Sequence, residues 1–169
     1  MSDLYTEELI ARKTSAVEKA LRIVMIAATA LALIAGLFIT PFAFILFLVL
    51  IIVDYVKIPQ FNLEYEYLYV NGELDIDKII SKTKRKRVGS YAVSNMELLA
   101  PLHSGELDAV KRDSSIKIRD CSSGEGEGRY GMVMNSNGKR EMIIFEPNET
   151  MLRDIRRLSP RIVVTTRPE

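Results

Sequence analysis

The chain has 169 residues, a formal net charge of +1 and 48% hydrophobic residues, which leaves room for a membrane segment and one small domain. From Lys57 onward there are 19 Lys and Arg residues and 17 Asp and Glu residues, and this balance excludes a strongly basic nucleic-acid-binding domain. The single cysteine, Cys121, excludes an intramolecular disulfide and is typical of a reducing compartment.

The first 22 residues are polar and predict a juxtamembrane helix. Ser2 or Asp3 can cap a helix that begins near Leu4, with Glu7 and Glu8 in its first turns. This helix either lies in the membrane interface or extends the first membrane span. The apolar run that follows is too long for a signal peptide, so we expect the segment to be retained.

The segment Ile23 to Val53 contains no charged side chain, and an apolar run of this length predicts membrane-spanning helix. Its 31 residues give about 46 Å of helix, which is too long for one upright span and too short for two ideal ones. Gly36 and Pro41 favour a turn near residues 36–41. We therefore predict a transmembrane helical hairpin over residues 23–56; the alternative is one long tilted helix with a proline kink.

Positive charges on both sides of the apolar run predict its orientation. Basic residues precede the run at positions 12, 13, 19 and 22, and they follow it at position 57 and from 82 to 87. Because positive flanks favour the cytoplasm, we expect a multi-pass protein of the cell membrane with both termini cytoplasmic. The absence of ionisable side chains within residues 23–53 argues against a transporter or a channel.

Residues 57–169 predict a cytoplasmic domain of short, mainly antiparallel strands. Period-2 alternation and turn residues indicate about seven strands, with an Asn71-Gly72 turn after the tyrosine-rich first strand. A second hairpin turns at residues 135–138. Asn148 then caps an amphipathic helix over residues 148–158, and residues 162–165 form either an extra edge strand or a tail. The predicted fold class is α+β.

This order of elements resembles a known fold. Four strands, three strands and a C-terminal helix between Asn62 and Leu158 resemble bacterial pleckstrin-homology-like (PH-like) domains. The whole arrangement is similar to a family of two-span membrane proteins from anaerobic Gram-positive bacteria, through the stretches at residues 65–76, 84–87 and 144–147. That family has no established activity, so the resemblance implies a fold and a topology rather than a reaction.

One basic run is the candidate site for a partner. On a strand, its lysines share one face and its arginines the other, so neither face can be buried and we expect a projecting ribbon or edge. Basic clusters beside a membrane attract anionic lipid by about 1 kcal/mol per residue, and PH-like folds often bind anionic headgroups. The alternatives are a solvated edge strand protected by its charges and a contact with a protein or nucleic acid. The run consists of Lys82, Lys84, Arg85, Lys86 and Arg87.

Other residues give no sign of catalysis. His103 has no second histidine or cysteine spaced to share a metal, Cys121 lacks a histidine neighbour, and the glutamates among the glycines at 124–128 would repel phosphate. We expect no enzymatic activity, catalytic residue, metal, cofactor, small-molecule substrate or nucleic-acid partner.

The sequence therefore predicts a membrane-anchored protein whose cytoplasmic PH-like interaction domain binds a protein partner or anionic lipid. The alternative is a small accessory subunit of a membrane transport or envelope complex. In that case its first helix would contact larger membrane partners through a face of small residues, namely Ala28, Ala32, Ala35 and Gly36.

Overall fold

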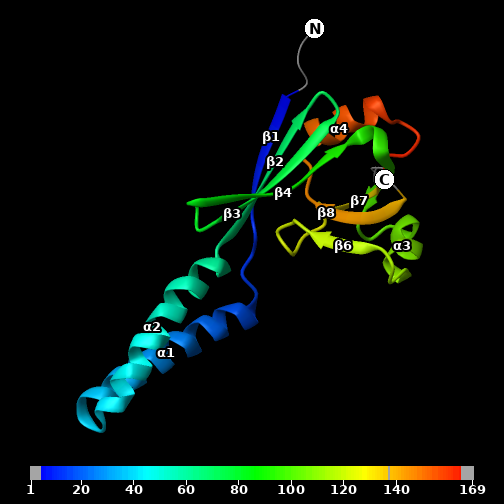
Figure 1. The fold of residues 1–169 in the computed structure, drawn as a ribbon. Coiled ribbons are helices and arrows are strands. Elements are labelled where there is room, and N and C mark those ends of the chain that lie inside the picture. The colour runs from blue at the N-terminus through cyan, green and yellow to red at the C-terminus, as the bar shows by residue number, and fades with distance from the viewer. Residues whose placement is uncertain (1–4, 137, 165–169) are drawn as a thin grey trace. The chain divides into compact units, whose positions relative to one another are not determined.

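The computed structural model describes residues 5–136 and 138–164. Over these residues the chain is α+β, with two long apolar helices, two sheets of mainly antiparallel strands and a C-terminal helix (Figure 1). It divides into a helical unit, made of residues 14–63 and 80–84, and a β unit that contains the other described residues. The predicted α+β class is confirmed, and the strands in the described residues number eight rather than about seven.

The first sheet has the strand order β1-β2-β3-β4. Its strands are β1 (Tyr5–Ala11), β2 (Leu63–Val70), β3 (Glu73–Ile80) and β4 (Lys84–Ala92). Asn71 and Gly72 connect β2 to β3 with φ angles of 48° and 90°, the left-handed pair that a two-residue hairpin turn requires. The predicted Asn-Gly hairpin is therefore present.

Strand β1 corrects the juxtamembrane helix that the sequence predicted for residues 1–22. The strand pairs with β2 in an antiparallel register that runs from Tyr5 opposite Val70 to Ala11 opposite Glu64. A loose alternation over seven residues is compatible with either a helix or a strand, and here a partner far along the chain decides between them. The caps predicted at residues 2 and 3 lie outside the described residues.

The two apolar helices are inserted between β1 and β2. The chain leaves β1, forms α1 (Ala16–Phe38), α2 (Pro41–Lys57) and the short 3-10 helix η1 (Ile58–Phe61), and then enters β2. Because β1 and β2 are hydrogen-bonded neighbours, the segments before and after the helices belong to one sheet. The helices are thus an insertion within the β domain and not an N-terminal addition to it.

The second sheet has the order β5-β7-β8-β6. Its strands are β5 (Met96–Pro101), β6 (Lys117–Asp120), β7 (Tyr130–Ser136) and β8 (Lys139–Phe145). Strand β6 pairs with β8 in parallel, and the pairs β1–β2, β5–β7 and β7–β8 are antiparallel, which agrees with the prediction of mainly antiparallel strands. Val163 forms a single parallel bridge to Leu99, so the described part of segment 162–165 lies against β5 without forming a full strand.

The main core of the β unit lies between the inner faces of the two sheets and helix α4 (Glu149–Leu158). Tyr67 and Tyr69 contribute from the first sheet and Phe145 from the second, and all three are fully buried. Asn148 caps α4 by accepting a hydrogen bond from the Met151 N–H at 2.8 Å, as the sequence predicted. A second cluster packs the short helix α3 (Asp108–Arg112) onto the other face of the second sheet.

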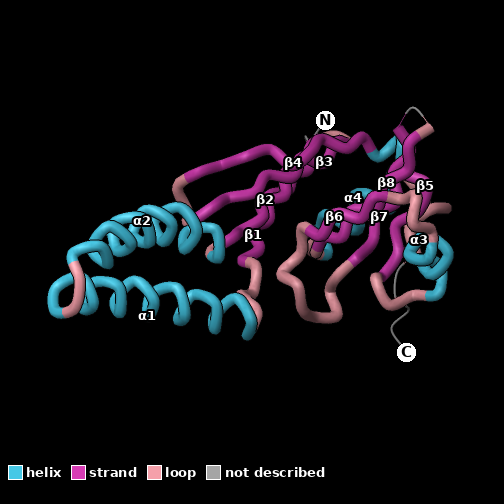
Figure 2. Tube along the Cα trace, turned by 60° about the horizontal axis from the view of Figure 1, so that its bottom comes forward, coloured by secondary structure: helices cyan, strands magenta, loops and turns pink. Residues whose placement is uncertain are grey.

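Helices α1 and α2 pack side by side as a hairpin (Figure 2). Ser15 begins α1 with a capping box completed by Glu18, and Ile39 and Thr40 separate the two helices within the region where the sequence predicted a turn. The segments Ala16–Phe38 and Pro41–Phe61, of 23 and 21 residues, are each long and apolar enough to cross a membrane. Two helices are therefore present instead of one kinked helix.

Small and polar residues form the contact between α1 and α2. Ala32 is buried, and a Cβ atom on Gly36 would lie 2.9 Å from the backbone nitrogen of Phe44. The Thr29 hydroxyl lies 2.7 Å from the carboxylate of Asp54. Asp54 belongs to α2, although it directly follows the uncharged run that ends at Val53. The small residues thus hold the hairpin together, which removes part of the face predicted to contact larger partners.

We expect Gly36→Val to destabilise the hairpin by about 1–3 kcal/mol, because the added side chain would push Phe44 away. Thermal unfolding of the full chain in detergent measures the change. Ala28→Val is the matched control, since Ala28 lies on the exposed face of α1 and the substitution introduces the same β-branched side chain. Equal effects of the two substitutions would show that the close contact at Gly36 does not hold the helices together.

Candidate functional site

The predicted basic run lies in the turn between β3 and β4 and along β4. The turn spans Ser81 to Thr83, and Ser81 and Lys82 adopt left-handed φ angles of 49° and 58°. Strand β4 is at the edge of its sheet, which agrees with the predicted edge or ribbon. All four of its basic residues are exposed.

The same turn is fastened to the segment that follows α2. The Ser81 N–H donates to the carbonyl of Asn62 at 2.8 Å, and the Ser81 hydroxyl donates to the carbonyl of Pro59 at 3.0 Å. Pro59 belongs to η1, which continues directly from α2. The turn that carries Lys82 is therefore held against the end of the second apolar helix.

The two arginines of β4 are neutralised by the sheet itself. Arg85 forms an ion pair with Glu66 at 2.7 Å, and Arg87 forms ion pairs with Asp75 at 2.9 Å and Asp77 at 3.4 Å. These carboxylates lie on β2 and β3, on the face away from the tyrosine core. Each exposed pair contributes about 0.2–1 kcal/mol to stability. The arginines therefore stabilise the sheet and have little charge left to attract a partner.

The lysines of β4 keep their charge available. Within the described residues, Lys84 and Lys86 have no ionic partner, and both side chains are exposed. They alternate with the paired arginines along the strand, so they lie on its other face. The sequence grouped all five basic residues together, whereas the structure separates paired arginines from these two unpaired lysines.

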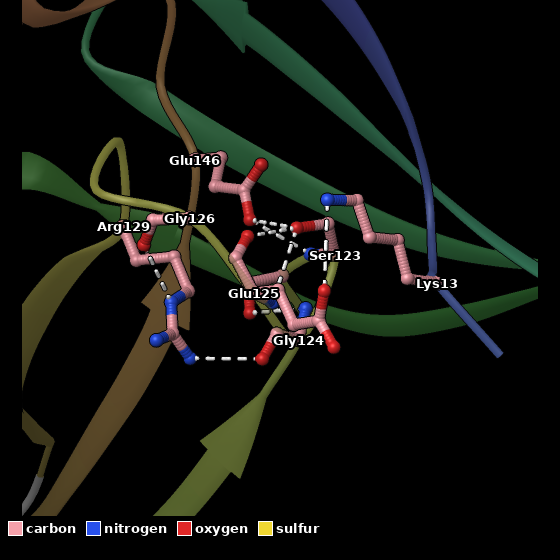
Figure 3. A network of polar contacts seen from close by, with 8 residues as sticks. Lys13, Ser123, Gly124, Glu125, Gly126, Arg129 and Glu146 are labelled. Carbon is pink, nitrogen blue, oxygen red and sulfur yellow. Dashed lines mark hydrogen bonds and ion pairs between the residues drawn. The ribbon is translucent and has the colours of Figure 1, made fainter. Parts of the chain in front are cut away.

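A second polar cluster, which the sequence did not predict, surrounds the loop between β6 and β7 (Figure 3). The Lys13 N–H donates to the carbonyl of Ser123 at 2.8 Å, and the Lys13 ammonium lies 3.6 Å from the Glu125 carboxylate. The Ser123 hydroxyl and N–H both contact Glu146 Oε1, at 2.6 and 2.9 Å. Arg129 closes the loop by donating to two of its carbonyls. The glycine-rich sequence of the loop did not predict this network of hydrogen bonds.

This cluster connects the end of β1 to the core. The Tyr67 hydroxyl donates to the carbonyl of Cys121 at 2.6 Å and accepts the N–H of Glu146 at 3.4 Å. Burial raises the pKa of Tyr67 strongly, so its hydroxyl keeps its proton and remains a donor. The chain that leads from β1 into α1 is thus tied through Ser123 and Glu146 to a buried tyrosine.

Cys121 and His103 are the other candidate residues from the sequence. Cys121 is buried, and burial raises its thiol pKa to about 11, so the thiolate that a nucleophile requires is scarce near neutral pH. His103 is exposed in the loop after β5. Among the described residues, no group of three or more His, Cys, Asp or Glu side chains is placed to hold a metal ion.

Comparison with known proteins finds one family model that matches most of the chain. The model described as "Bacterial PH-like domain (DUF6106)" matches residues 2–165. The matched segment runs through both sheets, the apolar helices and α4. No curated protein and no solved structure matches the chain.

Proposed function

The chain belongs to the bacterial PH-like domain family (DUF6106), and on that premise we propose that it is a non-enzymatic membrane protein whose PH-like domain binds anionic lipid beside its own anchor. The helices α1 and α2 supply the anchor, and the lysines at the β3–β4 turn and along β4 supply the lipid contact. The resemblance to proteins of anaerobic Gram-positive bacteria stays a prediction.

The pairing of β1 with β2 supports a two-span topology. The strand before the helices and the strand after them pair over seven residues, and strands on opposite sides of a bilayer cannot do so. An even number of crossings is therefore required if the helices span the membrane. Basic residues flank both helices, which favours the cytoplasm for both ends.

The observation that carries the lipid proposal is the attachment of the β3–β4 turn to η1. Two hydrogen bonds hold Ser81 to the segment directly after α2, so the start of β4 at Lys84 lies where the chain would leave the membrane. Unpaired lysines close to an anionic surface gain about 1 kcal/mol each. The arginines of the run are already occupied by Glu66, Asp75 and Asp77 and add little.

Removing the two unpaired lysines tests this proposal. We expect the full-length K84Q/K86Q variant to lose about 2 kcal/mol, or about thirtyfold, of its preference for phosphatidylglycerol over phosphatidylcholine. Native mass spectrometry of the detergent-solubilised protein, with each lipid added in turn, counts the retained lipids. Neither lysine has an ionic partner in the described residues, so stability should not change.

The matched control is R153Q/R161Q, which removes the same two charges from exposed positions in and after α4. We expect this variant to retain the preference of the wild type. If K84Q/K86Q and wild type bind phosphatidylglycerol equally, or if both variants lose the preference to the same degree, the contact is not located at β4.

A further inference from the structure

A cationic cleft lies in the second sheet. It has a volume of about 790 Å³ and is formed by residues 115–119, at the start of β6, and by residues 138–141, at the start of β8. A cleft of this size is within the range of small-ligand sites. The side chains that matter for its chemistry are Lys117, Arg119, Lys139, Arg140 and Glu141.

The arginines of the cleft already have partners. Arg119 lies 3.1 Å from the carboxylate of Glu141 and donates to the carbonyl of Val88 at 3.1 Å. Arg140 pairs with Glu97 at 2.8 Å. Among the described residues that line the cleft, Glu141 carries the only carboxylate, and it pairs with Arg119.

The lysines of the cleft differ from its arginines. Lys117 and Lys139 are exposed and have no ionic partner among the residues that the structure describes. Lys117 pairs in register with Glu141 of the parallel neighbour β8, and Lys139 lies two residues before Glu141 on the same face of that strand. Two long cationic side chains thus line one cleft.

We propose that this cleft binds a phosphate-bearing anion between Lys117 and Lys139. A phosphate group carries up to two negative charges and accepts hydrogen bonds in several directions, so one group can satisfy both ammonium ions. The Arg119–Glu141 ion pair lines the cleft beside them. The volume of the cleft accommodates a phosphorylated small molecule or the headgroup of a lipid, which share this chemistry.

The test uses the full chain in phosphatidylcholine nanodiscs and titrates it with pyrophosphate by calorimetry at low salt. We expect binding that K117Q/K139Q weakens at least about tenfold, because two charge-assisted contacts are removed. R153Q/R161Q, which removes two exposed charges in and after α4, should bind as the wild type does. Unchanged thermal unfolding of K117Q/K139Q verifies that the fold is intact, as the absence of ionic partners predicts.

A second arm distinguishes the source of the phosphate. Native mass spectrometry with added phosphatidic acid tests a lipid headgroup, and the loss of these adducts in K117Q/K139Q but not in R153Q/R161Q assigns the cleft to lipid. Loss of pyrophosphate binding alone assigns it to a soluble ligand. If K117Q/K139Q equals the wild type in both arms, the lysines are merely solvated and the proposal is wrong, whatever the result for β4.

Discussion

Replacing residues 14–61 by a linker of about four glycine and serine residues is expected to give a soluble, cooperatively folding β domain. The register that ends at Ala11 opposite Glu64 leaves the two chain ends on adjacent strands, a gap that short hairpin loops commonly bridge. By contrast, a fragment that begins at Asn62 lacks β1 and is expected to aggregate. Size-exclusion chromatography and urea unfolding of the two proteins measure the difference.

The reason for this contrast is the set of contacts that β1 makes. Ile10 packs against the main core, and the amide of Asn148 at the start of α4 donates to the Glu8 carboxylate at 2.6 Å. Without β1, the edge of β2 would expose unpaired backbone groups next to a tyrosine-rich face. A fragment from residue 62 onward that is monomeric and as stable as the linked domain would show that β1 is dispensable.

Replacing Tyr67 by alanine is expected to lower the free energy of unfolding by about 3–5 kcal/mol. Tyr67 is fully buried, and its ring meets that of Phe145 edge-on with centroids 5.6 Å apart. Its hydroxyl is also the partner of the Cys121 carbonyl. Urea unfolding of the linked domain, or thermal unfolding of the full chain in detergent, measures the loss.

The Tyr67→Phe variant separates the ring from the hydroxyl. It should cost about 1–3 kcal/mol, because the Cys121 carbonyl loses its hydrogen bond while the ring remains. It should also loosen the loop that Ser123 and Glu146 hold, which faster hydrogen exchange over residues 122–129 would show. If Tyr67→Phe lowered the free energy of unfolding as much as Tyr67→Ala, the packing of the ring would not be the main contribution of Tyr67.

Local signals were sufficient to predict several elements of the fold. The uncharged run gave the two apolar helices, and Asn71-Gly72 gave the first hairpin turn. Asn148 gave the start of α4. Each of these features depends on residues within a few positions of one another, so the physical cause is contained in a short window of sequence.

The errors arose where distant segments decide the structure. Strand β1, predicted as part of a helix, pairs with β2 across the whole helical insertion. The division of the basic run has the same origin. Alternation along β4 predicts that Arg85 and Arg87 share a face, but only the register of three strands brings Glu66 and the β3 aspartates to them.

The central claim is that the apolar hairpin interrupts one sheet and leaves both of its flanks on the same side of the membrane. Cysteine labelling in intact cells tests this claim most directly. Single cysteines replace Glu7, Ile39 or Glu127, all exposed positions, in a background that carries Cys121→Ala. We predict that a membrane-impermeant maleimide labels the cysteine at position 39 in intact cells, and those at 7 and 127 only after permeabilisation. Labelling of positions 7 and 127 from opposite sides would contradict the account.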